Sequence, residues 1–290
     1  MNACALYVTF QPDIADLKKS IEIMKEQVGL VIIVDNSDKK EAQEQVSSLS
    51  EENVLVLSQM SNTGIAAALN RGFREAMDRG CEWILTLDQD SRPQKGMVKA
   101  YDDFISRNKN KKIGAIGPTF TFSSRDKAQV SDTVEKVHTL ITSGCYVNAE
   151  AYKNVGGFRD ELFIDAVDTE FSWHLRKNGY SLYKLNSVLL EHNLGSNSYH
   201  IKIFGKRIMT ITNHNYLRCY YVARNSRVVG RDYSKVFPED GVPYYRKAYK
   251  KAFMILLFEK DKLRKLRAVK AGMEDAKKGK LGVCTRKFSA

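Results

Sequence analysis

The segment that most constrains the fold of this chain is an apolar run that ends in two carboxylates and a proline. Residues 83–87 have the sequence WILTL, and the chain continues through Asp88 and Asp90 to Pro93. An apolar run of this length, bounded by turn residues, predicts a strand buried on both faces. Ligands of open α/β sheets bind at the carboxyl ends of such strands. We therefore expect both acids at the ligand-binding edge of the sheet.

Asp88 and Asp90 are separated by one residue, a spacing that suits one hard divalent cation. Mg²⁺ and Mn²⁺ take oxygen ligands and are often held by one or two carboxylates together with substrate phosphates. The plainer interpretation is a solvated turn, because Asp and Ser are common turn residues. The motif alone does not decide between the two.

Strands and helices alternate through the first two hundred residues, which predicts βαβ units and a mostly parallel sheet. We expect strands at residues 3–10, 30–34, 53–57, 83–88, 113–118 and 137–147, and a strand pair at 181–191. We expect helices at residues 13–27, 65–79, 94–107, 149–154 and 169–178. From about residue 196 the pattern is helical, so we predict a domain at 1–200 and a helical region at 201–290.

Charge and cysteine content restrict the class of protein. The net charge is +12, and residues 244–290 alone carry 15 Lys or Arg and 4 Asp or Glu, so the basic character belongs to the last segment. The chain has no basic leader and no run of about eighteen apolar residues, which predicts neither a signal peptide nor a membrane-spanning helix. Five scattered cysteines without a CxxC pair argue against zinc and indicate a reducing cytoplasm.

Acidic residues and one histidine recur at predicted strand ends, where they would converge on one crevice. The motifs extend in order over about residues 3–230. They are Val8-Thr9-Phe10, Val34-Asp35-Asn36-Ser37, Asn62-Thr63-Gly64-Ile65-Ala66, Asn70-Arg71-Gly72, Leu87-Asp88-Gln89-Asp90-Ser91, Ser143-Gly144, Gly156-Gly157-Phe158, Phe163-Ile164-Asp165-Ala166-Val167-Asp168-Thr169-Glu170, His192-Asn193-Leu194-Gly195 and Arg224-Asn225. With these motifs the chain resembles a family 2 glycosyltransferase of GT-A fold, and within that family the bacterial rhamnosyltransferase branch.

The resemblance implies a nucleotide-sugar pocket at the ends of the first strands. Thr9 and Asp35 would line it, with Asp35 binding the pyrimidine base or the ribose. Asn62 and Gly64 would lie near the donor, where glycine lets the backbone approach closely. Asn62 is equally well explained as the N-cap of the following helix.

The resemblance also implies a Mg²⁺ or Mn²⁺ site. Asp88 and Asp90 would be the metal motif and would contact the donor diphosphate, with Asp90 as the direct ligand. His192 would complete the metal site or touch the diphosphate. A histidine satisfied by its neighbours at a strand end is the plainer interpretation of His192.

Asp168 matches the position of the catalytic base in this family. The N-terminal dipole of a helix would favour its ionised form, which suits removal of a proton from an acceptor hydroxyl. Asp168 is also a plausible helix N-cap, and Asp165 and Glu170 are close rivals. The chain has Val167 where the wider family more often has Glu before the Asp, which leaves the choice among the three acids open.

The activity implied by the resemblance is inverting transfer of a sugar, with L-rhamnose as the best guess. The donor would be dTDP-rhamnose or a UDP-sugar, and the acceptor a saccharide or lipid-linked saccharide of cell-surface polysaccharide synthesis. UDP-galactose, galactofuranose or glucose donors remain alternatives, as does a catalytically silent binding protein. A nucleotidyltransferase would need a Gly-rich basic loop after the first strand, and Gln11-Pro12-Asp13 offers none.

The basic C-terminal region has two interpretations. Lys and Arg clusters beside the apolar patch 253–258 suit a helix at an anionic membrane surface, which predicts a cytoplasmic protein held peripherally at the inner face of the membrane. Alternatively the patch packs on the core or on a second subunit in a homodimer. Charge alone would permit nucleic-acid binding, but no recognised motif accompanies it, so we expect none.

Overall fold

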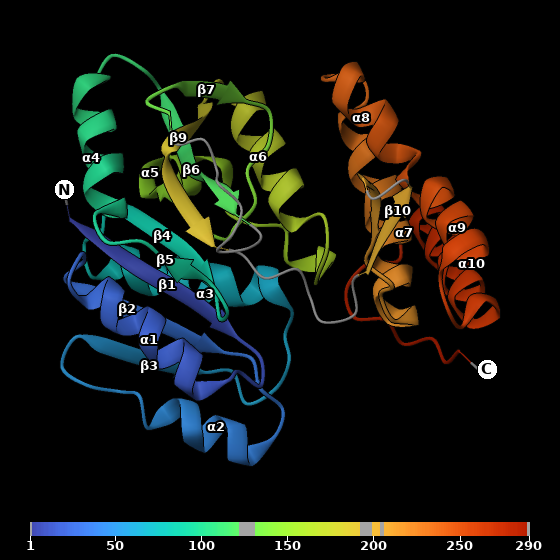
Figure 1. Cartoon of the computed structure of the whole chain (residues 1–290), viewed down its shortest axis with the longest axis horizontal. Helices are drawn as coiled ribbons and strands as arrows, with labels where there is room; N and C mark the ends of the chain where they lie inside the picture. The colour runs from blue at the N-terminus through green and yellow to red at the C-terminus, as the bar shows by residue number, and fades with distance from the viewer. Residues whose placement is uncertain (1, 122–130, 192–198, 204–205, 289–290) are drawn as a thin grey trace. The chain divides into compact units, whose positions relative to one another are not determined.

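The chain is divided into two compact units in a computed structural model, which describes residues 2–121, 131–191, 199–203 and 206–288. The first unit comprises Met1–Asp160 and Asp168–Asn193, and the second comprises Glu161–Val167 and Leu194–Ala290 (Figure 1). One division thus falls close to the boundary predicted near residue 200. The short segment Glu161–Val167 groups with the C-terminal residues, although it lies inside the predicted first domain.

The first unit is built on a nine-stranded sheet with the order β3-β2-β1-β4-β8-β6-β9-β5, and β7 pairs with β9. The strands are β1 (Ala3–Thr9), β2 (Leu30–Asp35), β3 (Val54–Ser58), β4 (Trp83–Asp88), β5 (Arg92–Pro93), β6 (Ile113–Thr121), β7 (Val134–Val137), β8 (Cys145–Asn148) and β9 (Ser181–Glu191). The run from β3 to β4 is parallel, as predicted. Beyond β4 the sheet is mixed, because β8 lies antiparallel to both β4 and β6.

Helices complete the α/β architecture of the first unit. They are α1 (Ile14–Lys25), α2 (Lys40–Ser47), α3 (Ile65–Asp78), α4 (Met97–Arg107), α5 (Ala149–Val155) and α6 (Val167–Lys177). Helix α2 was not predicted: it buries only Val46 and has no side-chain cap, so its sequence carries little helical signal.

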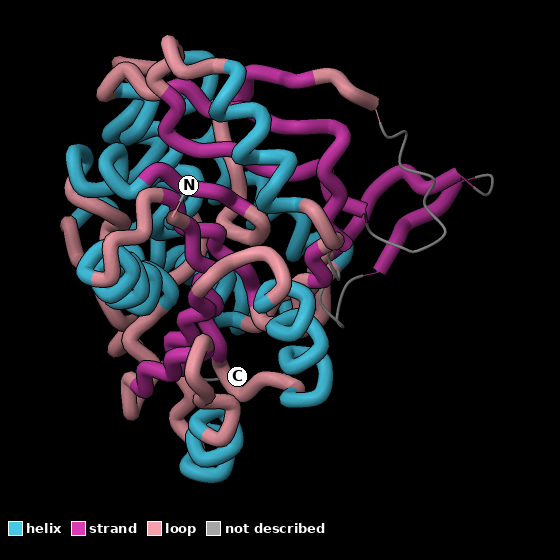
Figure 2. The backbone as a smooth tube through the Cα atoms, turned by 90° about the vertical axis from the view of Figure 1, so that its left-hand side faces the viewer, coloured by secondary structure: helices cyan, strands magenta, loops and turns pink. Residues whose placement is uncertain are grey.

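Both faces of the central strands are covered, which explains their continuous apolar sequence. Along β1, Ala5 and Tyr7 belong to a core cluster that includes Leu17 of α1. The intervening Leu6 faces α3, where a Cβ on Gly72 would lie 2.2 Å from the Leu6 side chain. Figure 2 shows the strands of the sheet in magenta between cyan helices.

Two predicted strand segments differ from the structure. Residues 137–147 do not form one strand: β7 ends at Val137 and β8 begins at Cys145, with a turn between them in which Gly144 has a φ of +72°. A Cβ at Gly144 would lie 2.8 Å from the side chains of Pro118 and Leu190, so the turn depends on glycine. The predicted strand pair at 181–191 is the single strand β9, parallel to β6 with two shifts of register.

The C-terminal part of the second unit contains a hairpin that was not predicted. Strands β10 (Tyr199–Ile203) and β11 (Lys206–Ile211) pair antiparallel where the sequence indicated helix. The helices are α7 (Tyr216–Tyr233), α8 (Pro238–Tyr245), α9 (Lys247–Phe258) and α10 (Lys262–Lys278). Cys219 and Ala223 of α7 pack with Ala248 and Ile255 of α9 and with Val269 of α10. None of the described helices combines the length and the apolar composition that crossing a bilayer requires.

Candidate active site

The carboxyl ends of β2, β1 and β4 lie side by side. In the parallel register Thr9 is paired with Asp35, and Val8 is paired with Asp88. Adjacent strands are about 4.8 Å apart, so the ends of three neighbouring strands meet at one edge of the sheet. The convergence that the sequence predicted is therefore present for Thr9, Asp35 and the Asp88–Asp90 turn.

The carboxylate of Asp35 is buried and only half satisfied. Its Oδ1 accepts hydrogen bonds from Thr9 Oγ1 at 2.9 Å, from Ser37 Oγ at 2.7 Å and from the Ser37 backbone N–H at 3.2 Å. Its Oδ2 is buried and has no hydrogen-bond partner among the described residues. A buried acceptor without a partner is costly, so this oxygen suits the donor group of a ligand.

The loop that leads into α3 is held by Asn36. Asn36 Nδ2 donates to the carbonyl of Gly64 at 3.0 Å, and Asn36 Oδ1 accepts from Thr63 Oγ1 at 3.0 Å. Gly64 is the N-cap of α3 and has φ +87° and ψ 160°, a conformation that essentially only glycine adopts. The alternative that Asn62 caps the helix is wrong: its exposed side chain accepts instead from the Gly64 N–H at 3.0 Å, within the loop.

The Asp88–Asp90 turn is fixed at both ends. The Asp88 N–H donates to Ser91 Oγ at 3.0 Å, the Ser91 N–H donates to the Asp88 carbonyl at 3.0 Å, and Gln89 Oε1 accepts from the Phe10 N–H at 2.7 Å. Asp88 is half-buried, and Asp90 is exposed. Two carboxylates on an ordered turn form a hard oxygen donor set, which fits Mg²⁺ or Mn²⁺. The predicted third ligand, His192, lies outside the described residues.

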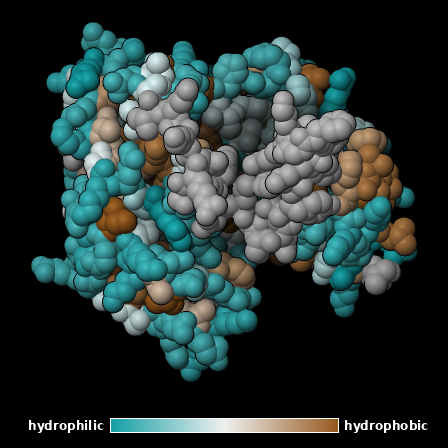
Figure 3. All heavy atoms as spheres, in the orientation of Figure 1, coloured by the Kyte–Doolittle hydropathy of each residue, from teal (hydrophilic) through white to brown (hydrophobic). Residues whose placement is uncertain are grey.

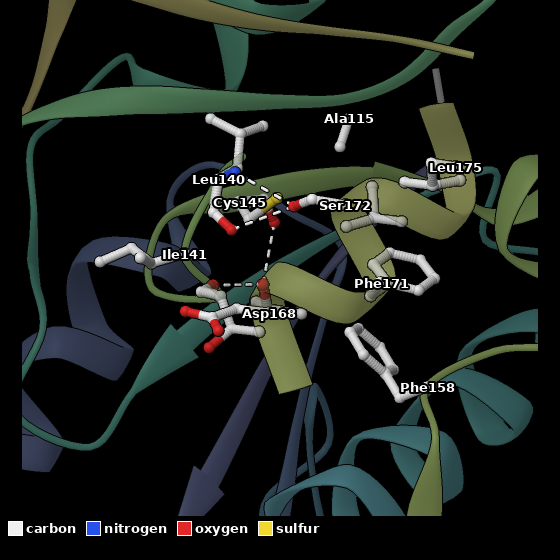
Figure 4. Close-up of a pocket in the computed structure, with 12 residues that line it drawn as sticks. Ala115, Leu140, Ile141, Cys145, Phe158, Asp168, Phe171, Ser172 and Leu175 are labelled. Atoms are coloured by element: carbon white, nitrogen blue, oxygen red, sulfur yellow. Dashed lines mark hydrogen bonds between the residues drawn. The ribbon is translucent and has the colours of Figure 1, made fainter. Parts of the chain in front are cut away.

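Asp168 is the second residue of α6, where the helix dipole favours a carboxylate. Its Oδ1 accepts from the Thr169 N–H at 2.7 Å. The carboxylate lines a pocket of about 10 Å³, room for a single water molecule, together with Thr86, Cys145 and Phe171 (Figure 4). Burial and, to a lesser degree, the charge of Asp168 raise the pKa of the Cys145 thiol to about 12, so the thiol stays protonated near neutral pH.

This small pocket relates Asp168 to the metal motif. Thr86 lines the pocket and lies two residues before Asp88 on β4. Alternate residues of a strand point to the same face, and two residues span about 7 Å. Asp88 therefore leaves β4 on the face of the sheet that carries the Asp168 pocket.

A known protein of the predicted branch matches most of the chain. The dTDP-rhamnosyl transferase RfbF of Shigella flexneri is 31% identical over 244 residues, which is 78% of this chain and 78% of that protein. The model of glycosyl transferase family 2 matches residues 13–132. The chain belongs to the family 2 glycosyltransferases.

Solved structures agree with the GT-A fold of this family 2 glycosyltransferase. TarS of Staphylococcus aureus in complex with UDP-GlcNAc has a TM-score of 0.62 at 14% identity, over 95% of this chain and 81% of that one. The mannosyltransferase PcManGT of Pyrobaculum calidifontis with GDP-Man and Mn²⁺ has a TM-score of 0.60 at 12% identity, over 96% and 75%. GalNAc-T7 with UDP, GalNAc and Mn²⁺ has a TM-score of 0.61 at 11% identity, but this chain spans only 56% of it. The predicted fold class is confirmed.

The two rival acids of this glycosyltransferase have other surroundings. Asp165 forms an ion pair with Arg218 at 3.3 Å within the second unit. Burial raises the pKa of Asp165, and nearby cations, Arg218 first, oppose that rise. Glu170 is buried at 4% exposure. Asp168 is thus the acid of the three that combines partial exposure with a position at the start of α6.

The loop that precedes Asp168 has an unusual backbone. Phe163, Asp165 and Ala166 have φ values of +65°, +62° and +68°. Non-glycine residues in this region cost about 1 kcal/mol or more each and persist only where the surroundings hold them. The loop of this glycosyltransferase is therefore maintained by contacts from elsewhere in the chain.

Arg224 and Asn225 supply those contacts and had no assigned role from the sequence. Both are completely buried in α7. Asn225 Nδ2 lies 2.8, 2.7 and 3.0 Å from the carbonyls of Leu162, Ile164 and Asp165, and Arg224 Nη2 donates to the Leu162 carbonyl at 3.1 Å. The sequence signal was the Arg224-Asn225 motif of the family resemblance, which carried no role.

Proposed function

We propose that this family 2 glycosyltransferase moves L-rhamnose from dTDP-rhamnose to a hydroxyl group of a saccharide acceptor, with inversion at the anomeric carbon. The observation that carries the nucleotide-sugar site is the unpaired, buried Oδ2 of Asp35 at the strand edge. The choice of rhamnose is supported by the similarity to the dTDP-rhamnosyl transferase of Shigella flexneri.

The donor nucleotide lies, in this proposal, at the ends of β1 and β2. In a nucleotide, uracil and thymine each keep one ring N–H, which would donate to Asp35 Oδ2 while Thr9 and Ser37 keep Oδ1 in place. Gly64 and Asn62 border the donor. Gly64 has no side chain, so the donor can approach the backbone of the loop closely.

The diphosphate lies at the Asp88–Asp90 turn with one divalent cation, Mg²⁺ or Mn²⁺. Asp90, which is exposed, would be the direct ligand, Asp88 would contact the cation or the diphosphate, and His192 would complete the site. The bound cation would offset the negative charge that develops on the leaving diphosphate. The hydrogen bonds of the turn fix its backbone at Asp88 and the side chain of Gln89.

Asp168 is the catalytic base in this proposal. Its carboxylate takes the proton of the acceptor hydroxyl as the hydroxyl oxygen bonds to the anomeric carbon. The bond from that carbon to the diphosphate oxygen breaks on the opposite face, and the nucleoside diphosphate leaves with the electron pair. A single displacement of this kind inverts the configuration and needs no covalent sugar–enzyme intermediate.

The acceptor is a saccharide or a lipid-linked saccharide in this proposal. The second unit, with its strongly basic sequence, would hold the enzyme peripherally at the inner face of the cell membrane, close to lipid-linked acceptors. A homodimer is the alternative to this membrane contact for the exposed apolar residues of the unit.

A panel of UDP-, dTDP- and GDP-sugars, each with and without Mn²⁺ or Mg²⁺, tests the donor by thermal stabilisation and by release of the nucleoside diphosphate. We expect dTDP-rhamnose with a cation to give the largest stabilisation. Asp168→Asn should keep donor binding and lose most turnover, by about 10²-fold or more. An active Asp168→Asn enzyme would show that the base is misassigned. Binding of every donor without a metal ion would contradict the proposed metal and diphosphate site.

A further inference from the structure

Helix α9 has an apolar face on each side. Ala248 and Ile255 are buried at 0% exposure against α7 and α10. On the other side four large apolar residues are more than half exposed, namely Tyr249, Phe253, Leu256 and Leu257. Their spacing of four, three and one residues places them on one stripe of the helix. In Figure 3 a brown patch bordered by teal lies where Figure 1 draws α9.

A fifth exposed apolar residue follows α9 in the chain. Leu263, in the first turn of α10, is 69% exposed. We name these five residues, Tyr249, Phe253, Leu256, Leu257 and Leu263, the α9 face. An apolar surface of this kind in contact with water usually marks a site of interaction.

Exposed cations border the α9 face. They are Arg246, Lys247, Lys250, Lys260 and Lys262. One acid of this region, Glu259, does not oppose them, because its buried carboxylate bonds Lys251 at 2.5 Å and Lys265 at 2.8 Å. Between Arg246 and Lys270 the other acid is Asp261, which is exposed. The α9 face thus has an apolar centre and a positive rim.

We propose that the α9 face binds an anionic lipid bilayer, with the apolar stripe inserted at the level of the headgroups and the cationic rim on the lipid phosphates. This rests on the proposed peripheral membrane contact and assigns it to particular residues. Helices with an apolar stripe between basic residues lie in the plane of the membrane interface. The physical argument favours lipid over a second copy of the chain, because apposing two α9 faces would bring two positive rims together.

The test is co-sedimentation of the full chain with vesicles of phosphatidylcholine alone and of an equimolar mixture with phosphatidylglycerol. We expect binding to the anionic vesicles, little binding to the neutral ones, and weaker binding as salt is raised. Each Lys near an anionic surface contributes about fivefold in affinity. Charge reversal at Lys250 and Lys262 together (K250E and K262E) should therefore reduce the binding by more than about 25-fold.

Apolar variants separate insertion from simple charge attraction. Phe253→Ser with Leu257→Ser should weaken binding to anionic vesicles by about tenfold or more, because less apolar surface enters the membrane. Val236→Ser, at another exposed apolar residue of the second unit, and Lys277→Glu, at the far end of α10, are matched controls that should bind normally. Thermal unfolding of each variant confirms that it is folded.

Three outcomes would overturn the proposal. They are no binding of the wild-type chain to anionic vesicles, unchanged binding of the charge-reversal and serine variants, and a wild-type dimer in solution that becomes a monomer in those variants. Donor hydrolysis in the absence of lipid should be the same in all variants. If the chain binds vesicles but hydrolyses no donor, the result supports the membrane-binding surface and contradicts the proposed sugar transfer. If the chain hydrolyses a donor but does not bind vesicles, the result contradicts only the membrane-binding surface.

Discussion

Asp35→Asn is the substitution that most directly tests the nucleotide pocket. Asparagine has the same shape as aspartate, and its Oδ1 would still accept from Thr9 and Ser37, so the fold of the strand edge is kept. The change falls on the second position, where the unpaired carboxylate Oδ2 becomes an NH₂ donor. A ligand N–H that met an acceptor in the wild type would meet a donor in the variant.

The size of the effect follows from that geometry. A hydrogen bond to a charged group contributes about 1.5–3 kcal/mol. Its loss corresponds to roughly a 10- to 150-fold rise in the Kd of the nucleotide. The folding free energy should change by only about 1 kcal/mol, because the bonds to Oδ1 remain, although without the full charge.

Isothermal titration with UDP and dTDP, with a divalent cation present, measures the affinity, and urea unfolding measures stability. Asp38→Asn is the control, because it removes an exposed carboxylate three residues away that accepts a hydrogen bond from Gln11. If Asp35→Asn binds both nucleotides as tightly as the wild type, then Asp35 Oδ2 does not contact the base or the ribose. The pocket would then have to be placed elsewhere.

Three further predictions concern groups that hold the two units in shape. Asn225→Ala should lower the free energy of unfolding by about 2–4 kcal/mol in urea, since it leaves buried carbonyls of the loop before Asp168 unpaired. Asn154→Ala, which removes one exposed hydrogen bond, is the control. A loss for Asn225→Ala no larger than that of the control would show that Asn225 does not hold the loop. Gly64→Ala should weaken donor binding and cost about 1–3 kcal/mol because of the positive φ, whereas Gly29→Ala, in open space, should be neutral. Burial opposes ionisation of Glu259, but the bonds from Lys251 and Lys265 outweigh it and lower its pKa. Glu259→Gln should therefore cost about 3 kcal/mol at neutral pH.

The pH dependence of the last variant gives it a separate check. A carboxylate whose pKa is lowered by folding contributes stability above its unfolded pKa, and the contribution is lost as the pH falls through the folded pKa. The difference in stability between the wild type and Glu259→Gln should thus shrink below about pH 4. A difference that stays constant from neutral to acid pH would show that Glu259 is not stabilised as an anion.

Local sequence was sufficient where one short segment carried the whole signal. The apolar run before Asp88 predicted β4 and its burial, and the alternation of strands and helices up to residue 88 predicted the parallel half of the sheet. The motifs at the strand ends predicted the family and the GT-A fold, which the comparisons confirm. The roles of Thr9, Asp35, Asp90 and Asp168 remain predictions, although the structure gives Asp35 an unpaired oxygen that fits one of them.

Other features depended on contacts between residues far apart in the chain. Helix α2 carries almost no apolar pattern, because it buries one side chain. The hairpin of β10 and β11 lies in a region whose local pattern indicated helix. The turn at Gly144 separates β7 from β8 because Pro118 and Leu190 leave no space for a side chain there.

The sequence by itself determined the strands that build the parallel part of the sheet, the acids at the strand ends and the positive charge of the C-terminal region, since each of these is a property of neighbouring residues. Only the tertiary structure decided that Asn225 holds the strained loop before Asp168, although Asn225 follows Asp168 by more than fifty residues in the chain. Only the structure decided, too, which side of α9 is packed and which is exposed, because both sides are apolar in sequence. Hydrogen bonds and burial between distant residues leave no periodic pattern in the chain, and the fold alone makes them visible.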